Sequence, residues 1–115
     1  MITIYHNPRC RKSREVLALL DEMRLPYTTR LYLKEPPSKA EISALLKQLD
    51  VQPLEMIRKN ESVFKEQHKG KQYTKDQWIS IIADNPILIE RPIVIKDNKA
   101  VIGRPSSKVV QLLNN

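Results

Sequence analysis

The sequence of 115 residues contains one cysteine and two glycines, and each scarcity excludes a class of protein. A lone thiol cannot form an intramolecular disulfide, so the chain is not a secreted scaffold held together by disulfides. Because Gly70 and Gly103 are the only glycines, the chain has no glycine-rich phosphate-binding loop. We also expect no metal site, since the only soft ligands besides Cys10 are His6 and His68.

The sequence also lacks an apolar run of the roughly 20 residues that a membrane-spanning helix needs. After Met1 it enters directly into a strand-like segment, and we read no signal peptide there. A single unpaired thiol suits a reducing compartment. We therefore expect a cytoplasmic protein that makes no membrane contact and forms a single domain over residues 1–115, a length that can bury a core without disulfides or metals.

The formal net charge is +7, which indicates either a solvated basic surface or an anionic partner, such as nucleic acid or a small anion. Aromatic residues make up only 5% of the chain and are not interleaved with basic ones, which disfavours nucleic acid. The one local cluster of basic residues surrounds Cys10 and consists of Arg9, Arg11, Lys12 and Arg14.

Hydrophobic periodicity predicts an α/β protein with a helical insert. We expect strands over residues 2–5 and 27–33, joined by a helix that begins at Cys10 and ends at Pro26. Helices follow over 38–49 and from Thr74 to Asn85, both with capping-box signatures, and shorter helices over 54–59 and 61–67. Short strands over 93–95 and 100–102 flank a turn at Asp97-Asn98, and a helix containing Val109 to Leu113 comes last. A βαβ unit followed by ββα is the thioredoxin plan, with the helical insert between the two halves.

Cys10 is the candidate reactive group, because it lies between a predicted strand and the start of a predicted helix. Unpaired backbone N–H groups at a helix start carry partial positive charge, and neighbouring cations add to it. Such surroundings attract anions and lower the pKa of a cysteine from about 8.5 to somewhere near 3.5–7.5. The alternative is a buried, inert cysteine.

Ser13 lies three residues after Cys10, where a dithiol enzyme has its second cysteine. Its hydroxyl can donate a hydrogen bond to the Cys10 sulfur, but it cannot form a disulfide. A redox cycle would therefore need a thiol from another molecule. Alternatively, Ser13 only satisfies backbone groups at the start of the helix.

The chain lacks the arginine that a phosphatase-type loop places six residues after its cysteine, because Val16 occupies that position. Arginines more distant in the sequence would have to hold an oxyanion, and the planar guanidinium group suits a tetrahedral anion. The candidates are Arg58, Arg91 and Arg104, although each could also be an ordinary surface charge.

Five motifs, in order and spread over nearly the whole chain, resemble the glutaredoxin-coupled arsenate reductases. They are His6-Asn7-Pro8 ahead of Cys10, Arg58-Lys59-Asn60, Asn85-Pro86-Ile87-Leu88-Ile89, Arg91-Pro92-Ile93-Val94 and Arg104-Pro105. The resemblance implies a thioredoxin-like fold and no bound cofactor, with glutathione as a co-substrate.

The resemblance also assigns roles to individual residues. Cys10 would be the nucleophile, and the three candidate arginines Arg58, Arg91 and Arg104 would bind the oxyanion. Pro92 would follow a cis peptide bond beside the cysteine. His6 and Ser13 match positions that support the thiolate.

The chain departs from the family directly after the cysteine. Established arsenate reductases have Cys-Gly-Thr-Ser there, whereas this chain has Cys10-Arg11-Lys12-Ser13 and resembles a sister branch with Arg-Cys-x-Lys-Ser. Three functions are open. In the first, Cys10 attacks arsenate, glutathione attacks the adduct and glutaredoxin resolves the mixed disulfide. The second is a glutathione-linked thiol reductase with another substrate. The third is a non-enzymatic transcription regulator that binds RNA polymerase, although such regulators usually carry Cys-x-x-Cys.

Overall fold

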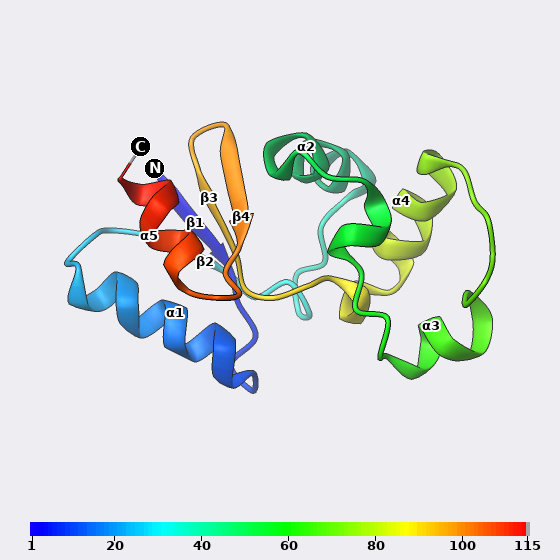
Figure 1. Ribbon diagram of the computed structural model, residues 1–115, viewed down its shortest axis with the longest axis horizontal. Coiled ribbons are helices and arrows are strands. Elements are labelled where there is room, and N and C mark those ends of the chain that lie inside the picture. The colour runs from blue at the N-terminus through cyan, green and yellow to red at the C-terminus, as the bar shows by residue number, and fades with distance from the viewer. Residues whose placement is uncertain (115) are drawn as a thin grey trace. The chain divides into compact units, whose positions relative to one another are not determined.

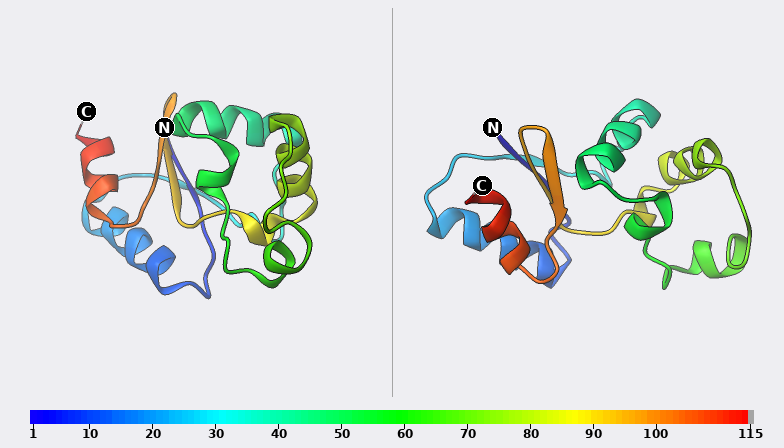
Figure 2. Two further views of the ribbon diagram at one scale, coloured as in Figure 1. Left: turned by 45° about the vertical axis from the view of Figure 1, so that its right-hand side comes forward. Right: turned by 45° about the horizontal axis from the view of Figure 1, so that its top comes forward.

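A computed structural model describes residues 1–114, which form two compact units (Figures 1 and 2). The first unit combines residues 1–35 with 91–114 and contains the β-sheet, whereas the second unit, residues 36–90, is helical. The second unit corresponds to the predicted helical insert, and the single domain expected from the sequence stays a prediction. Within residues 1–114, no helix is both long and apolar enough to cross a membrane.

The first unit contains a four-stranded mixed sheet with the strand order β2-β1-β3-β4. The strands are β1 (Ile2–Tyr5), β2 (Thr28–Arg30), β3 (Ile93–Lys96) and β4 (Lys99–Ile102). β1 pairs in parallel with β2 and antiparallel with β3, which in turn forms an antiparallel hairpin with β4. The sheet confirms the predicted βαβ and ββα halves, and it places the two halves side by side through the β1–β3 pair.

Two helices of the first unit, α1 (Arg11–Glu22) and α5 (Ser107–Leu113), pack on the sheet through one core (Figure 1). Its buried members are aliphatic and come from both strands and helices: Ile2, Ile4, Val16, Leu20, Val94, Val109 and Leu112. Burying each such side chain contributes about 1.5–3 kcal/mol. Because this core fixes α1 against β1, the loop between them, which carries Cys10, is fixed as well.

Gly103 is a close-approach position at the end of the β3–β4 hairpin. Its N–H donates a hydrogen bond to the Pro92 carbonyl oxygen over 2.8 Å. A Cβ atom at this position would lie 3.1 Å from side-chain atoms of Pro92, Val16 and Val109, which is tighter than ordinary packing allows. Glycine therefore lets the segment after β4 lie directly against the segment before β3.

The second unit consists of α2 (Lys39–Leu49), η1 (Pro53–Met56), α3 (Ser62–Gln67), α4 (Lys75–Asp84) and η2 (Pro86–Leu88). Both capping boxes predicted from the sequence are present. The Ser38 hydroxyl accepts a hydrogen bond from the Glu41 N–H over 3.1 Å, and the Thr74 hydroxyl accepts one from the Gln77 N–H over 3.1 Å. These caps satisfy backbone donors at the helix starts and explain why α2 and α4 begin where the sequence predicts.

Strand β2 is shorter than predicted. The sequence favours a strand over 27–33, but the structure has three residues, Thr28–Arg30. The chain turns directly afterwards, because the N–H groups of Lys34 and Glu35 both donate to the Leu31 carbonyl oxygen, over 3.0 and 2.8 Å. The extended preference of this segment is overridden by a local turn.

Two predicted helices also have different ends. The first begins at Arg11, with Cys10 as its N-cap, and stops at Glu22, since Arg24 adopts a left-handed conformation with φ of 55°. The helix predicted over 54–59 is the short 3₁₀ helix η1 instead, because Ile57 becomes extended and forms a bridge with Ile89. In both places a backbone conformation ends the helix before the hydrophobic pattern does.

Candidate active site

Cys10 occupies the N-cap position of α1, in an extended conformation. Its N–H donates to the Asn7 carbonyl oxygen over 3.0 Å, and its own carbonyl oxygen accepts from the Arg14 N–H over 3.0 Å. The residue is 8% exposed, so the thiol is near the surface but largely shielded from water. The predicted position at a helix start is confirmed, and the unpaired N–H groups of the first turn lie beside the side chain.

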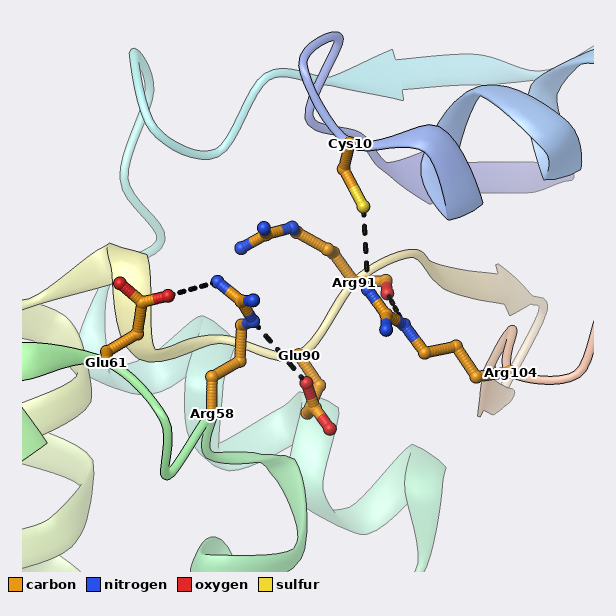
Figure 3. Close-up of polar contacts among 6 residues, drawn as sticks. All are labelled: Cys10, Arg58, Glu61, Glu90, Arg91 and Arg104. Carbon is orange, nitrogen blue, oxygen red and sulfur yellow. Dashed lines mark hydrogen bonds and ion pairs between the residues drawn. The ribbon is translucent and has the colours of Figure 1, made fainter.

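Two arginines of the first unit meet at the cysteine (Figure 3). The Arg104 Nη2 group donates a hydrogen bond to the Cys10 sulfur over 3.5 Å, and the Arg91 guanidinium group interacts with the same thiol and lowers its pKa. The Arg104 Nε group donates to the Arg91 carbonyl oxygen over 2.7 Å, which ties the two arginines together. The structure thus brings three of the predicted site residues into one cluster.

Arg91 is half-buried and is held by a residue that the sequence did not indicate. Its side chain interacts with the hydroxyl of Tyr32, which is fully buried and stacks on Tyr5 with ring centroids 6.2 Å apart. The buried Nε group of Arg91 has no hydrogen-bond acceptor among the described residues. Leaving a buried donor without an acceptor costs about 1–3 kcal/mol.

Burial of the Cys10 side chain raises the pKa of its thiol, but three neighbours outweigh this effect. The hydrogen bond and the charge of Arg91, together with the backbone N–H groups of Ser13 and Lys12, lower the pKa below the ordinary value for cysteine. A thiolate at this position is both a stronger nucleophile than a thiol and a partner for the two guanidinium groups.

The sequence predicted that the charges of the nearby basic residues help to lower the pKa of the cysteine, and this prediction is wrong. Arg11 and Lys12 pair with Glu15, at 3.4 and 3.8 Å, and their side chains are 84% and 56% exposed. Arg14 donates to the Pro8 carbonyl oxygen over 2.9 Å. These side chains are directed to other partners, and Arg91 is the charged side chain that lowers the pKa of the thiol.

His6 and Ser13 form a buried pair beside the cysteine loop. The Ser13 Oγ lies 2.8 Å from His6 Nδ1 and accepts a hydrogen bond from the Asn7 N–H over 3.1 Å. The Ser13 hydroxyl therefore binds the loop, in place of the predicted bond to the Cys10 sulfur. Burial, and then the positive charge of Arg14, lower the pKa of His6 and favour its neutral ring.

Pro92 is buried, and the Arg91–Pro92 peptide bond is cis, as the sequence predicts. The Arg104–Pro105 bond is cis as well, which the sequence analysis did not predict. The carbonyl oxygen of Pro92 accepts the hydrogen bond from the Gly103 N–H, so the two arginines leave neighbouring points of the backbone.

Arg58 belongs to the second unit and is held by two carboxylates there (Figure 3). Its Nη1 group pairs with Glu61, and its Nε group lies 3.8 Å from a carboxylate oxygen of Glu90. Its backbone N–H donates to the Leu88 carbonyl oxygen over 2.7 Å. The three-residue spacing to Glu61 was a signal in the sequence, whereas nothing in it indicated Glu90. Oxyanion binding by Arg58 stays a prediction.

The mixed sheet and the cysteine at a helix start define a thioredoxin-like protein with a thiol site. Residues 5–112 match the model of the ArsC family. The uncharacterized protein YfgD of Escherichia coli strain K12 is 40% identical over 114 residues, which cover 97% of this chain and 96% of that protein. An arsenate reductase of Escherichia coli is 36% identical over 113 residues, covering 97% of this chain and 80% of that enzyme.

A solved structure agrees with the fold. The structure of an arsenate reductase from Vibrio cholerae superposes with a TM-score of 0.92 at 39% identity, and the match covers 96% of this chain and 95% of that one. The chain belongs to the ArsC family and has its thioredoxin-like fold. Both the family and the fold predicted from the sequence are confirmed. Among residues 1–114, no group of three or more His, Cys, Asp and Glu residues could hold a metal ion.

Proposed function

We propose that this protein is a thiol-dependent reductase that converts arsenate to arsenite, with Cys10 as the nucleophile. The observation that carries the proposal is the cluster in which Arg104 donates a hydrogen bond to the Cys10 sulfur and Arg91, tied to Arg104, lowers the pKa of the same thiol. The buried Arg91 Nε without an acceptor, among the residues described, adds a donor for an oxyanion. Membership in the ArsC family, whose members include arsenate reductases, supports the choice of substrate.

In the first step, the arginines hold the oxyanion and the cysteine attacks it. Arg91 and Arg104 bind arsenate oxygens, and each charged hydrogen bond contributes roughly 1.5–3 kcal/mol. The Cys10 thiolate attacks arsenic, a sulfur–arsenic bond forms, and one arsenate oxygen leaves as water after protonation. The guanidinium groups stabilise the negative charge on the remaining oxygens.

In the second step, an external thiol completes the reduction. A glutathione thiolate attacks the Cys10 sulfur and forms a disulfide with it. The sulfur–arsenic bond breaks, and its electron pair stays on arsenic, which becomes arsenite. A glutaredoxin thiolate then attacks the glutathione sulfur and releases the Cys10 thiolate. External thiols fit a chain with a single cysteine, and a reaction that uses them suits a reducing compartment such as the cytoplasm.

A coupled assay tests this function. NADPH consumption is followed with glutathione, glutaredoxin and glutathione reductase present, and we expect it to depend on both arsenate and this protein. Cys10→Ser should abolish the consumption while keeping the native circular dichroism spectrum, because a hydroxyl is a far poorer nucleophile. Replacing glutaredoxin and glutathione with thioredoxin and its reductase identifies the coupling.

Three other results would contradict the proposal. No arsenate-dependent consumption with either reducing system would reject arsenate as the substrate. Turnover of a small disulfide in place of arsenate would indicate a glutathione-linked thiol reductase. Co-purification with RNA polymerase, without turnover, would indicate a regulator.

A further inference from the structure

The charges at the start of α1 oppose the helix dipole. The first turn of this helix contains no acidic residue but begins with Arg11 and Lys12, and its last turn contains no basic residue. Helices favour the reverse arrangement, by about 0.3–1 kcal/mol per charge. The capped helices α2 and α4 of the same chain also begin with a lysine, but each has an acidic residue in the same turn, Glu41 and Asp76. A sequence that breaks a local rule of helix stability at this place suggests a functional role for Arg11 and Lys12.

The cluster also carries an excess of positive charge. We call Arg9, Arg11, Lys12 and Arg14 the basic rim, and all four are exposed. Among the described residues, Glu15 is the one carboxylate paired with the rim, where it is shared by Arg11 and Lys12. Because Arg14 bonds only a neutral carbonyl group, four positive charges face one negative charge.

Two residues of the basic rim, Arg9 and Arg11, flank the reactive cysteine in the chain. Their Cα atoms lie about 3.8 Å from that of Cys10, so a molecule that approaches the sulfur comes within about one Debye length, ~10 Å at 0.1 M salt, of these residues. The pKa of the thiol is lowered by Arg91 and by backbone N–H groups and not by the rim. Because its side chains are exposed, the rim is accessible to a charge that arrives from solution, such as a second thiol that approaches the Cys10 sulfur.

We propose that the basic rim determines which thiol donor resolves Cys10, by favouring small thiols that carry carboxylate groups over neutral ones. This inference rests on the proposed role of Cys10 as a nucleophile that needs an external thiol. Glutathione, a small thiol with two carboxylates, has the required chemistry. Arg91 and Arg104 hold the oxyanion. The rim, which does not include these two arginines, selects the thiol donor.

A thiol–disulfide exchange assay isolates this selection. Cys10 is first converted to its mixed disulfide with pyridine-2-thiol, which is uncharged. A donor thiolate then attacks the Cys10 sulfur, a new sulfur–sulfur bond forms, and pyridine-2-thiolate leaves with the electron pair of the broken bond. The rate constants for 3-mercaptopropionate and 2-mercaptoethanol are measured at low salt. When the ratio of the two rate constants is compared between protein variants, the intrinsic reactivity of each thiol cancels.

The test variant is R11Q/K12Q, and the matched control is R24Q/K99Q. Both remove one arginine and one lysine from the first unit. Arg24 follows the far end of α1, which is about 18 Å long at 1.5 Å per residue. Lys99 pairs with Lys96, which itself pairs with Ile2 at the other end of β1 from the cysteine loop. Both control residues are exposed.

We expect R11Q/K12Q to lower the ratio of the anionic to the neutral donor about two-fold for each charge removed, or roughly four-fold in total. High salt should remove the difference, whereas the control should keep the wild-type ratio. The thermal midpoint of R11Q/K12Q should equal or exceed that of the wild type, since the helix dipole is relieved. An unchanged ratio in R11Q/K12Q, or an equal fall in both variants, would overturn the proposal. Because the assay contains no arsenate, its result is independent of whether arsenate is the substrate.

Discussion

Arg104 donates a hydrogen bond to the sulfur of Cys10 over 3.5 Å, although the two residues are 94 positions apart in the sequence. The sheet produces this meeting, because β1 leads into the cysteine loop and β4 leads into Arg104, while β3 lies between them. Arg91 precedes β3 and lowers the pKa of the same cysteine. The chemistry proposed for the protein depends on this convergence.

The first prediction separates these arginines from the basic rim. Arg91→Gln and Arg104→Gln should each weaken sulfate or arsenate binding about ten-fold to over a hundred-fold, because each removes a charged hydrogen bond worth roughly 1.5–3 kcal/mol. Arg11→Gln and Lys12→Gln should cost much less, since both side chains point to Glu15. Isothermal titration calorimetry with sulfate measures all four. Larger losses at Arg11 or Lys12 would place the anion on the rim.

The second prediction concerns the acidity of the thiol. The pH dependence of iodoacetamide alkylation should show an inflection below the value of about 8.5 for an ordinary cysteine. Arg91→Gln should move that inflection upward, because Arg91 lowers the pKa of Cys10 through a hydrogen bond and its charge. R11Q/K12Q should leave it close to the wild-type value. A wild-type inflection at or above about 8.5 would contradict the account.

These two predictions mark what the sequence could and could not provide. The position of Cys10 at a helix start follows from the change of periodicity after residue 5 and from Pro8, which are local signals. The source of its acidity is not local, because Arg91 reaches the sulfur only through strand pairing. Sequence proximity therefore pointed to Arg11 and Lys12, whereas the sheet supplied Arg91.

The limits of the fold prediction have the same origin. The capping boxes of α2 and α4 each lie within four residues, and the sequence located both helices closely. The end of η1 depends on a bridge between Ile57 and Ile89, which no local pattern encodes. Tyr32 was missed as a partner of Arg91 for the same reason, since its burial and its contact depend on tertiary packing.

The third prediction uses the buried histidine. Burial and the charge of Arg14 lower the pKa of folded-state His6, while the unfolded chain keeps a value of about 6.5. As the pH falls below about 6.5, the unfolded state takes up a proton before the folded state does. Stability should therefore fall by up to ~1.4 kcal/mol per pH unit until the folded-state pKa is reached.

His6→Gln should remove this contribution. Urea unfolding of both proteins between neutral and mildly acidic pH gives the free energy of unfolding at each pH. We expect the wild-type curve to fall more steeply than that of the variant below about 6.5. Parallel curves would show that His6 titrates alike in the folded and unfolded states.

The fourth prediction concerns Arg58, whose guanidinium group pairs with Glu61 and lies near Glu90. An oxyanion that binds Arg58 has to compete with these carboxylates. Glu61→Gln should therefore strengthen sulfate binding roughly two- to five-fold, in line with the modest energy of a partly exposed ion pair. Glu66→Gln, an exposed position on α3, is the charge-matched control and should have little effect. Weaker binding in Glu61→Gln would instead mean that Glu61 orients Arg58 for the anion.

The central claim is that Cys10 carries electrons from an external thiol to an arginine-bound arsenate. Mass spectrometry of the protein after incubation with glutathione, in the presence and absence of arsenate and without glutaredoxin, tests it most directly. The account predicts a glutathione disulfide on Cys10 that forms when arsenate and glutathione are present together. The same disulfide should form much more slowly in the Arg91→Gln variant. A protein that stays unmodified with both reagents, or that is modified equally without arsenate, would contradict the account.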